Sequence, residues 1–227
     1  MLGKKICVFD FETDGSNPRE CSPVQLAAVI IDPIKLEIIK DSEFNAYLKP
    51  DLLEQNIDHQ YGTDILDFHA KVKGCSQADI IESWKNYPKQ EYAWKQFINY
   101  LDKYHCRSSR KNEFSAPIAA GYNIHRFDMI IVNRLSQKYK NTNKENYTNI
   151  FNPRDVLDIM NLIFYWFESI EKIKSYSLDN IRDYLGIDKS GAHDALKDVT
   201  DCANILIRFL KLHRNLSPKV NFENSFK

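Results

Sequence analysis

The sequence predicts a single domain of the α/β class. Apolar runs of strand type dominate residues 6–48, and apolar residues at helical spacing dominate most of the chain beyond residue 50. The chain has 227 residues, of which 43% are hydrophobic and 27% are charged. This length and composition are typical of one globular domain with a core of ordinary size, and they argue against disordered and fibrous classes.

The first strand is expected at residues 6–13, and it carries two carboxylates at its end. Asp10 and Glu12 are two residues apart, so they point to the same side of the strand. Like charges at a buried strand end persist when they are protonated, paired with bases or holding a cation. Residues 13–15 then turn the chain, which places the pair at the carboxyl end of a strand, where open α/β sheets bind ligands.

Two further strands are expected at residues 23–31 and 36–48, antiparallel to one another because the link between them is short. Residues 50–116 then become helical and charged, with helical spacing at 80–84 and 92–104 and a polar surface loop at 107–112. This middle section is the least informative part of the sequence.

The second half alternates short strands and helices. A buried strand is expected at residues 117–122, and the next helix carries one apolar stripe formed by Phe127, Ile130, Ile131 and Leu135. Asp128 lies off this stripe, in the first turn, where the helix dipole favours a carboxylate. The remaining elements are a strand near Ile150 and helices at 156–167 and 178–185, the second ended by Gly186.

The last helix is expected at residues 194–213, with an apolar face and a second, acidic face. The acidic face carries Asp194, Asp198 and Asp201, and periodicity does not choose among them. His193 is predicted to lie in the preceding loop and to turn back over this face. Together with Asp10, Glu12 and Asp128, one or more of these aspartates would form an all-oxygen site suited to Mg²⁺ or Mn²⁺.

Charge and cysteine content limit the classes of partner. Lys plus Arg and Asp plus Glu both number 31, so a nucleic acid would be held by local patches or by metal, and residues 103–111 and 138–144 are candidate patches. The five cysteines show no CxxC spacing, which argues against a disulfide framework and favours a cytoplasmic protein. No apolar run approaches transmembrane length, so no membrane partner is expected.

Three motifs resemble those of a known family. The run Phe-Asp-Phe-Glu-Thr-Asp-Gly at 9–15, Asn-x-x-x-Phe-Asp at 123–128 and His-x-x-x-x-Asp at 193–198 resemble the three ordered motifs of the DEDDh family of 3′→5′ exonucleases. The resemblance covers about residues 5–212 and implies a ribonuclease H-like fold, a mixed sheet flanked by helices. It also implies two Mg²⁺ or Mn²⁺ ions per site. In that family pattern His193 would be the general base, and the metal ligands would be Asp10, Glu12, Asp128 and Asp198.

The resemblance also sets the expected function and its alternatives. We expect an exonuclease domain at residues 1–213, a C-terminal tail at 214–227, and release of nucleoside 5′-monophosphates from the 3′ ends of DNA, preferably single-stranded. The alternatives are a 3′→5′ exoribonuclease acting on RNA or short oligonucleotides, and an inactive module that docks on a polymerase. A proofreading role would require a separate polymerase partner.

Four other residues near the motifs complete the expectations. Thr13 and Asn123 are candidates for holding the terminal nucleotide, although Asn123 fits a helix cap equally well. Asp194 and Asp201 match no ligand role in the family and are expected to be solvated residues of the last helix.

Overall fold

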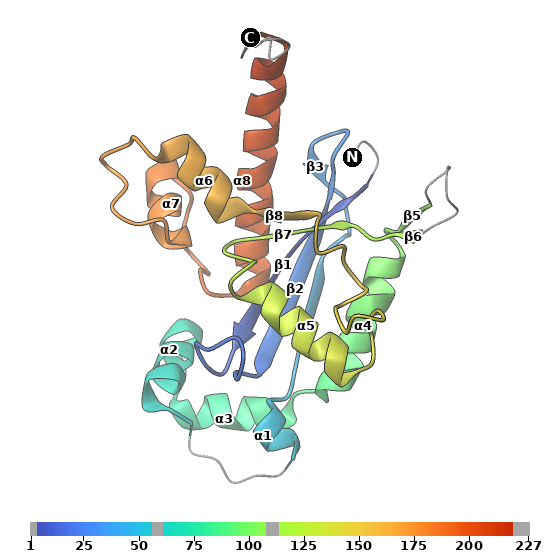
Figure 1. Cartoon of the computed structure of the whole chain (residues 1–227). Helices are drawn as coiled ribbons and strands as arrows, with labels where there is room; N and C mark the ends of the chain where they lie inside the picture. Colours follow the sequence, from blue (N-terminus) through green and yellow to red (C-terminus); the bar gives the residue numbers. More distant parts are fainter. Residues whose placement is uncertain (1–3, 56–60, 108–113, 220–227) are drawn as a thin grey trace.

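The computed structural model describes residues 4–55, 61–107 and 114–219 (Figure 1). A mixed β-sheet runs through the molecule, with helices packed on both of its faces, as the sequence predicts. Its central strand is β1 (Ile6–Thr13), the strand that carries Asp10 and Glu12. The predicted site therefore lies on the strand around which the sheet is built.

Both kinds of strand pairing meet at β1. On one side it pairs antiparallel with β2 (Pro23–Asp32), and on the other side it pairs parallel with β7 (Ile118–Gly121), which in turn pairs parallel with β8 (Val156–Asp158). Two short strands, β3 (Glu37–Ile38) and β4 (Phe44–Tyr47), both pair antiparallel with β2.

Two of the strand predictions are wrong in detail. The predicted third strand is divided into β3 and β4, because Asp41 lies between them in the left-handed backbone region with φ of 57° and turns the chain. The strand expected near Ile150 lies instead at β8, and Asp158 at its end caps the following helix by accepting a hydrogen bond from the Met160 N–H. Short apolar runs do not distinguish strand from helix, which explains the second error.

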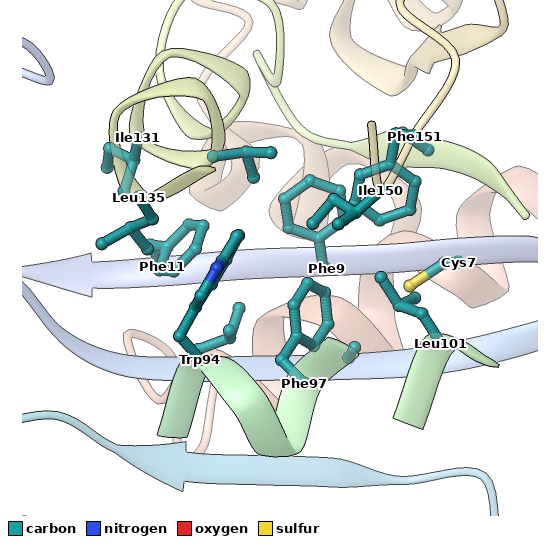
Figure 2. Close-up of a cluster of buried hydrophobic side chains, with 14 of the residues drawn as sticks. Cys7, Phe9, Phe11, Trp94, Phe97, Leu101, Ile131, Leu135, Ile150 and Phe151 are labelled. Atoms are coloured by element: carbon teal, nitrogen blue, oxygen red, sulfur yellow. The ribbon is translucent and has the colours of Figure 1, made fainter. Parts of the chain in front are cut away.

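One face of the sheet is covered by α4 (Gln90–Asp102) and α5 (Asp128–Lys138). Figure 2 shows Cys7, Phe9 and Phe11 of β1 pointing into this layer, where they meet side chains of both helices. The ring of Phe9 stacks on that of Phe151 with 5.1 Å between centroids. This aromatic cluster fixes the orientation of β1.

The opposite face is covered by α8 (Ala195–Leu216), with α6 (Ile159–Phe167) and α7 (Leu178–Leu185) beside it (Figure 1). Ile6 and Val8 of β1 pack in this layer. Because side chains alternate along a strand, Asp10 and Glu12 continue the row of Ile6 and Val8 and face α8. The apolar row thus becomes acidic at its carboxyl end.

A third group of helices lies at the carboxyl end of β1 (Figure 1). It consists of α1 (Asp51–Glu54), α2 (Thr63–Lys73) and α3 (Gln77–Asn86), which share a small core that includes Leu66 and Trp84. The sequence predicts the helical spacing inside α3 and α4 but does not resolve α1 and α2.

The remaining elements lie toward the ends of the described ranges. A two-stranded ladder joins β5 (Cys106–Arg107) to β6 (Phe114–Ser115), and the predicted loop at 107–112 falls mostly outside the described residues. Helix α8 continues to Leu216 and is followed by the 3₁₀ turn Ser217–Lys219, so the first residues of the predicted tail are helical. Within the described ranges, none of the helices combines the length and apolar character that a membrane span needs.

Candidate active site

Three carboxylates from two elements converge at the carboxyl end of β1. Asp10 and Glu12 come from the strand and Asp198 comes from the first turn of α8, and each offers one oxygen within 4.8 Å of the others. Asp10 and Glu12 accept no hydrogen bond from any side chain or backbone group in the described part of the chain. The sequence motifs predict that these three residues belong to one site, and the structure brings their carboxylate oxygens together.

Asp128 approaches from the other face of the sheet. It is the first residue of α5 and is 1% exposed, and its Oδ1 accepts a hydrogen bond of 3.1 Å from the backbone N–H of Phe11. This bond places its carboxylate beside Asp10, whose charge helps to raise the pKa of Asp128 well above its ordinary value, after the larger effect of burial. Asp128 is thus a buried neighbour of the three-oxygen cluster, rather than an exposed acid at a helix start.

His193 lies in the loop before α8, as predicted. Its backbone has φ of 66°, and its N–H donates a hydrogen bond of 3.2 Å to Oδ1 of Asp198. Its Nε2 lies 3.3 Å from Oδ2 of Asp179, and its ring makes a T-shaped contact with that of Phe68, with 5.0 Å between the ring centroids. The histidine is therefore tied to Asp198 through the backbone while its ring remains 39% exposed.

The two predicted nucleotide-binding residues lie at the end of β1 and in the segment between β7 and α5, since Thr13 is the last residue of β1 and Asn123 follows β7. Thr13 donates its hydroxyl hydrogen to the Gly15 carbonyl at 2.6 Å, and its own carbonyl accepts from Nε2 of His69 at 2.8 Å. Asn123 has φ of 54° and lies before the N-terminal residues of α5, so it is not a helix cap. Its Oδ1 is buried and has no hydrogen-bond partner in the described ranges.

Arg182 is the main residue of the site that the motifs did not indicate. It is fully buried and lies on α7, and its guanidinium contacts three carboxylates: Nη2 donates to Asp198 at 2.6 Å, Nε to Asp201 at 2.8 Å and Nη1 to Asp179 at 3.0 Å. A buried arginine in the middle of an ordinary amphipathic helix has no sequence signal. Only the helix packing reveals it.

The prediction that Asp194 and Asp201 are solvated residues is wrong for Asp201, whereas Asp194 is partly exposed. Asp201 is 6% exposed and pairs with both Arg182 and Lys197. Asp194 is the N-cap of α8, accepting from the backbone N–H groups of Leu196 and Lys197, and it also accepts from Gln25 at 3.1 Å. Both residues therefore have structural partners that account for them.

The electrostatics of the cluster fit a hard cation. Burial, with the charge of Asp198 as the second cause, raises the pKa of Asp10 to about 7, and burial together with Asp10 raises the pKa of Glu12 to about 9. Carboxylates that repel one another and lack hydrogen-bond donors gain most from a divalent ion with oxygen ligands. The residues present thus fit Mg²⁺ or a similar ion.

These shifts predict how the stability of the metal-free protein depends on pH. In the unfolded chain the two groups have ordinary pKa values of 3.8 and 4.5. Between about pH 4 and pH 9 the folded protein therefore binds more protons than the unfolded chain, so its free energy of unfolding falls as the pH rises, and from about pH 7 to pH 9 Glu12 causes most of this fall. His69, whose pKa burial lowers from 6.5, acts in the opposite direction only at lower pH.

Thermal melts with a chelator should show this loss between about pH 7 and pH 9 as a fall in Tm of at least about 5 °C, since 1 kcal/mol corresponds to roughly 2–4 °C in a chain of this size. With saturating Mg²⁺ the fall should be much smaller, because the ion competes with the protons. Equal slopes with and without Mg²⁺ would contradict the assignment of these carboxylates to a cation site.

The comparison with known protein families points to the part of the chain that contains Asp128, His193 and Asp198. The family model described as "Exonuclease" (RNase_T) matches residues 110–206, which include Asp128, His193 and Asp198. Asp10 and Glu12 lie outside this match, and the fold brings them to the matched residues. No curated protein matches the sequence.

Solved nuclease structures share the fold over nearly the whole chain. E. coli exonuclease I in complex with a dT13 oligonucleotide is 18% identical, with a TM-score of 0.68 over 95% of this chain and 43% of that one. Exonuclease I from Methylocaldum szegediense is 20% identical, with a TM-score of 0.65 over 95% of this chain and 41% of that one. A 3′-exonuclease described by its recognition of the histone mRNA stem-loop is 18% identical, with a TM-score of 0.61 over 93% of this chain and 83% of that one.

The chain spans less than half the length of the exonuclease I structures that it matches. At this level of identity the structural likeness establishes the fold, and the family match covers the residues of the second and third motifs. The ribonuclease H-like fold that the resemblance implies is thereby confirmed, and the match of residues 110–206 to the exonuclease family model agrees with the family that the three motifs resemble.

Proposed function

We propose that this protein is a metal-dependent 3′→5′ exonuclease. The proposal rests on one observation above all, the convergence of one oxygen each from Asp10, Glu12 and Asp198 within 4.8 Å, with Asp128 beside them. Four carboxylates of this kind suit two Mg²⁺ or Mn²⁺ ions with Asp10, Glu12, Asp128 and Asp198 as ligands. Such ions supply charge stabilisation to both the attacking and the leaving oxygen at phosphorus.

The side chains around the carboxylates perform the remaining steps of the proposed reaction. The imidazole of His193 accepts a proton from the water that attacks the terminal phosphorus. The new oxygen–phosphorus bond forms as the bond to the 3′ oxygen of the preceding nucleotide breaks, and that oxygen takes up a proton. Each cycle thus releases a nucleoside 5′-monophosphate and leaves a new 3′-hydroxyl.

The terminal nucleotide is proposed to lie between the end of β1 and the segment between β7 and α5. Asn123 contributes a buried Oδ1 that lacks a hydrogen-bond partner in the described ranges, and the turn at residues 13–15 contributes backbone groups and Thr13. An acceptor without a donor is costly in a protein interior, and a ribose hydroxyl or base amino group would satisfy it.

Single-stranded DNA is the proposed substrate, because a chain without net positive charge has no broad surface to hold a duplex open. RNA is a second candidate. The structure described by its recognition of the histone mRNA stem-loop is matched over 83% of its length, far more than the DNA-bound exonuclease I.

A polymerase partner would add proofreading, and a role as an inactive docking module is disfavoured by retention of all five motif residues.

The test uses three 5′-labelled substrates, single-stranded DNA, duplex DNA and RNA, each with Mg²⁺ and with a chelator. We expect a ladder of labelled products that shorten stepwise, faster on single strands than on blunt duplex, and no reaction with chelator. Immediate release of the labelled nucleotide, or internal cleavage, would contradict the 3′→5′ direction or the exonuclease mode. Equal rates on single strand and duplex would remove the proposed preference, and the RNA arm decides between the two substrate classes.

A further inference from the structure

Arg182 connects the two functional parts of the proposed site. Its Nη2 donates at 2.6 Å to Oδ1 of Asp198, a proposed cation ligand, and its Nη1 donates at 3.0 Å to Oδ1 of Asp179. The other oxygen of Asp179 lies 3.3 Å from Nε2 of His193, the proposed base. One guanidinium therefore lies between the carboxylate that would bind a cation and the carboxylate that contacts the base.

The hydrogen bonds to Asp198 leave its two oxygens in different states. Oδ1 accepts from both Arg182 and the His193 backbone N–H, at 2.6 and 3.2 Å. Oδ2 accepts no hydrogen bond from the residues that the structure describes. The carboxylate is thus held by one oxygen while the other remains available as a single-atom ligand to a cation.

A further carboxylate, that of Asp201, holds Arg182 in place. The Nε of Arg182 donates at 2.8 Å to Oδ2 of Asp201, and Lys197 binds both oxygens of Asp201 at 2.7 and 2.6 Å. Arg182 is 0% exposed, so its position is set by packing as well as by these bonds. A planar guanidinium with donors in a rigid fork can hold two carboxylates at fixed relative angles, which a lysine ammonium cannot.

We propose, building on the proposed function, that Arg182 is a positioning residue that orients Asp198 toward the cation and, through Asp179, orients the ring of His193. Groups that orient the ligands and bases of metal sites typically contribute about 10–100-fold to metal affinity or activity. Asp179 takes part in this positioning, because its contact with Nε2 of His193 leaves the other ring nitrogen to face the substrate. A buried arginine with only a structural role would affect folding and leave both properties unchanged.

The first test replaces Arg182 by lysine, which keeps the charge and removes the fork. We expect R182K to lower Mn²⁺ affinity, measured by calorimetry, and kcat by about tenfold each, with KM for the oligonucleotide within about threefold of wild type. R214K is the matched control, because Arg214 donates to the backbone carbonyls of Pro33 and Ile34, away from the site, and should leave all three values unchanged. A folded R182K with wild-type affinity and kcat would overturn the proposal.

The second test is a double-mutant cycle that leaves Arg182 in place. D179N should lower kcat by about tenfold while Mn²⁺ affinity stays at the wild-type value. In a protein that already carries H193N, the same change should have no further effect, because the two residues act as a unit. Losses that multiply would show that Asp179 does not act through His193. Should the wild type lack nuclease activity, the proposed function fails, whereas the Mn²⁺ titration of R182K still decides the Asp198 part of this inference.

Discussion

Replacement of Asp10 by asparagine is expected to lower kcat by at least about a thousandfold, because a proposed ligand at the centre of the carboxylate cluster loses its charge. The same change should raise the Tm of the metal-free protein by several degrees at pH 8. Burial raises the pKa of Asp10 to about 7, so its charge is unfavourable in the folded protein at that pH, and the amide removes the charge without changing the volume. Activity assays and melts with a chelator measure the two effects.

Asp32 offers a matched control for this experiment. It lies at the far end of β2, where a hydrogen bond of 2.6 Å from Lys5 is the largest cause that lowers its pKa to about 2. A group with a depressed pKa contributes stability above its unfolded value, so D32N should destabilise the protein at pH 8 and leave kcat unchanged. The same chemical change should thus have opposite effects on Tm at the two sites.

If D10N were less stable than the wild type without metal, Asp10 would be a structural acceptor and the cluster would not be a cation site. If D10N kept its activity, the proposed ligand set would be wrong. A D10N protein that is more stable and inactive would show that the wild type keeps the unfavourable charge of Asp10 because activity depends on it. Such a loss of stability in favour of activity is common at catalytic sites.

The strand that carries Asp10 was predictable because local and long-range requirements agree there. The apolar residues of β1 that are buried on the two faces of the sheet are the same residues that predict a strand from the sequence. The change from Ile6 and Val8 to Asp10 and Glu12 marks the end of the apolar row that faces α8. Helix α7 was predictable for a similar reason, since Gly186 ends it with φ of 67°. In these elements, sequence pattern and packing carry the same information.

The supporting residues were not predictable because their roles depend on tertiary contacts. Arg182 resembles any polar residue of an amphipathic helix until α7 packs beside α8 and buries it among three carboxylates. His69 and Phe68 lie in a helix that short-range patterns did not resolve, yet they contact Thr13 and His193. Periodicity left Asp194, Asp198 and Asp201 equivalent, and the structure separates them by their partners as an N-cap, a cluster member and an anchor of Arg182.

His193 provides the second large effect, and asparagine is the replacement of choice there. The backbone of His193 has φ of 66°, a region that asparagine adopts more readily than alanine, so H193N removes the imidazole with little added strain. We expect kcat to fall by roughly a hundred- to ten-thousandfold, the usual contribution of a general base. Single-turnover assays at saturating Mg²⁺ would measure this loss.

The metal affinity of H193N should stay within about threefold of wild type, because an imidazole outside the ligand set adds little to an ion held by carboxylates. The structure supports this separation: the oxygens of Asp10, Glu12 and Asp198 form the cluster, whereas the His193 ring lies against Asp179 and Phe68. D198N is the comparison, since it removes a proposed ligand and should weaken Mn²⁺ binding severely. An H193N protein that lost Mn²⁺ affinity as severely as D198N would show that His193 binds the ion, and the proton acceptor would then be another group.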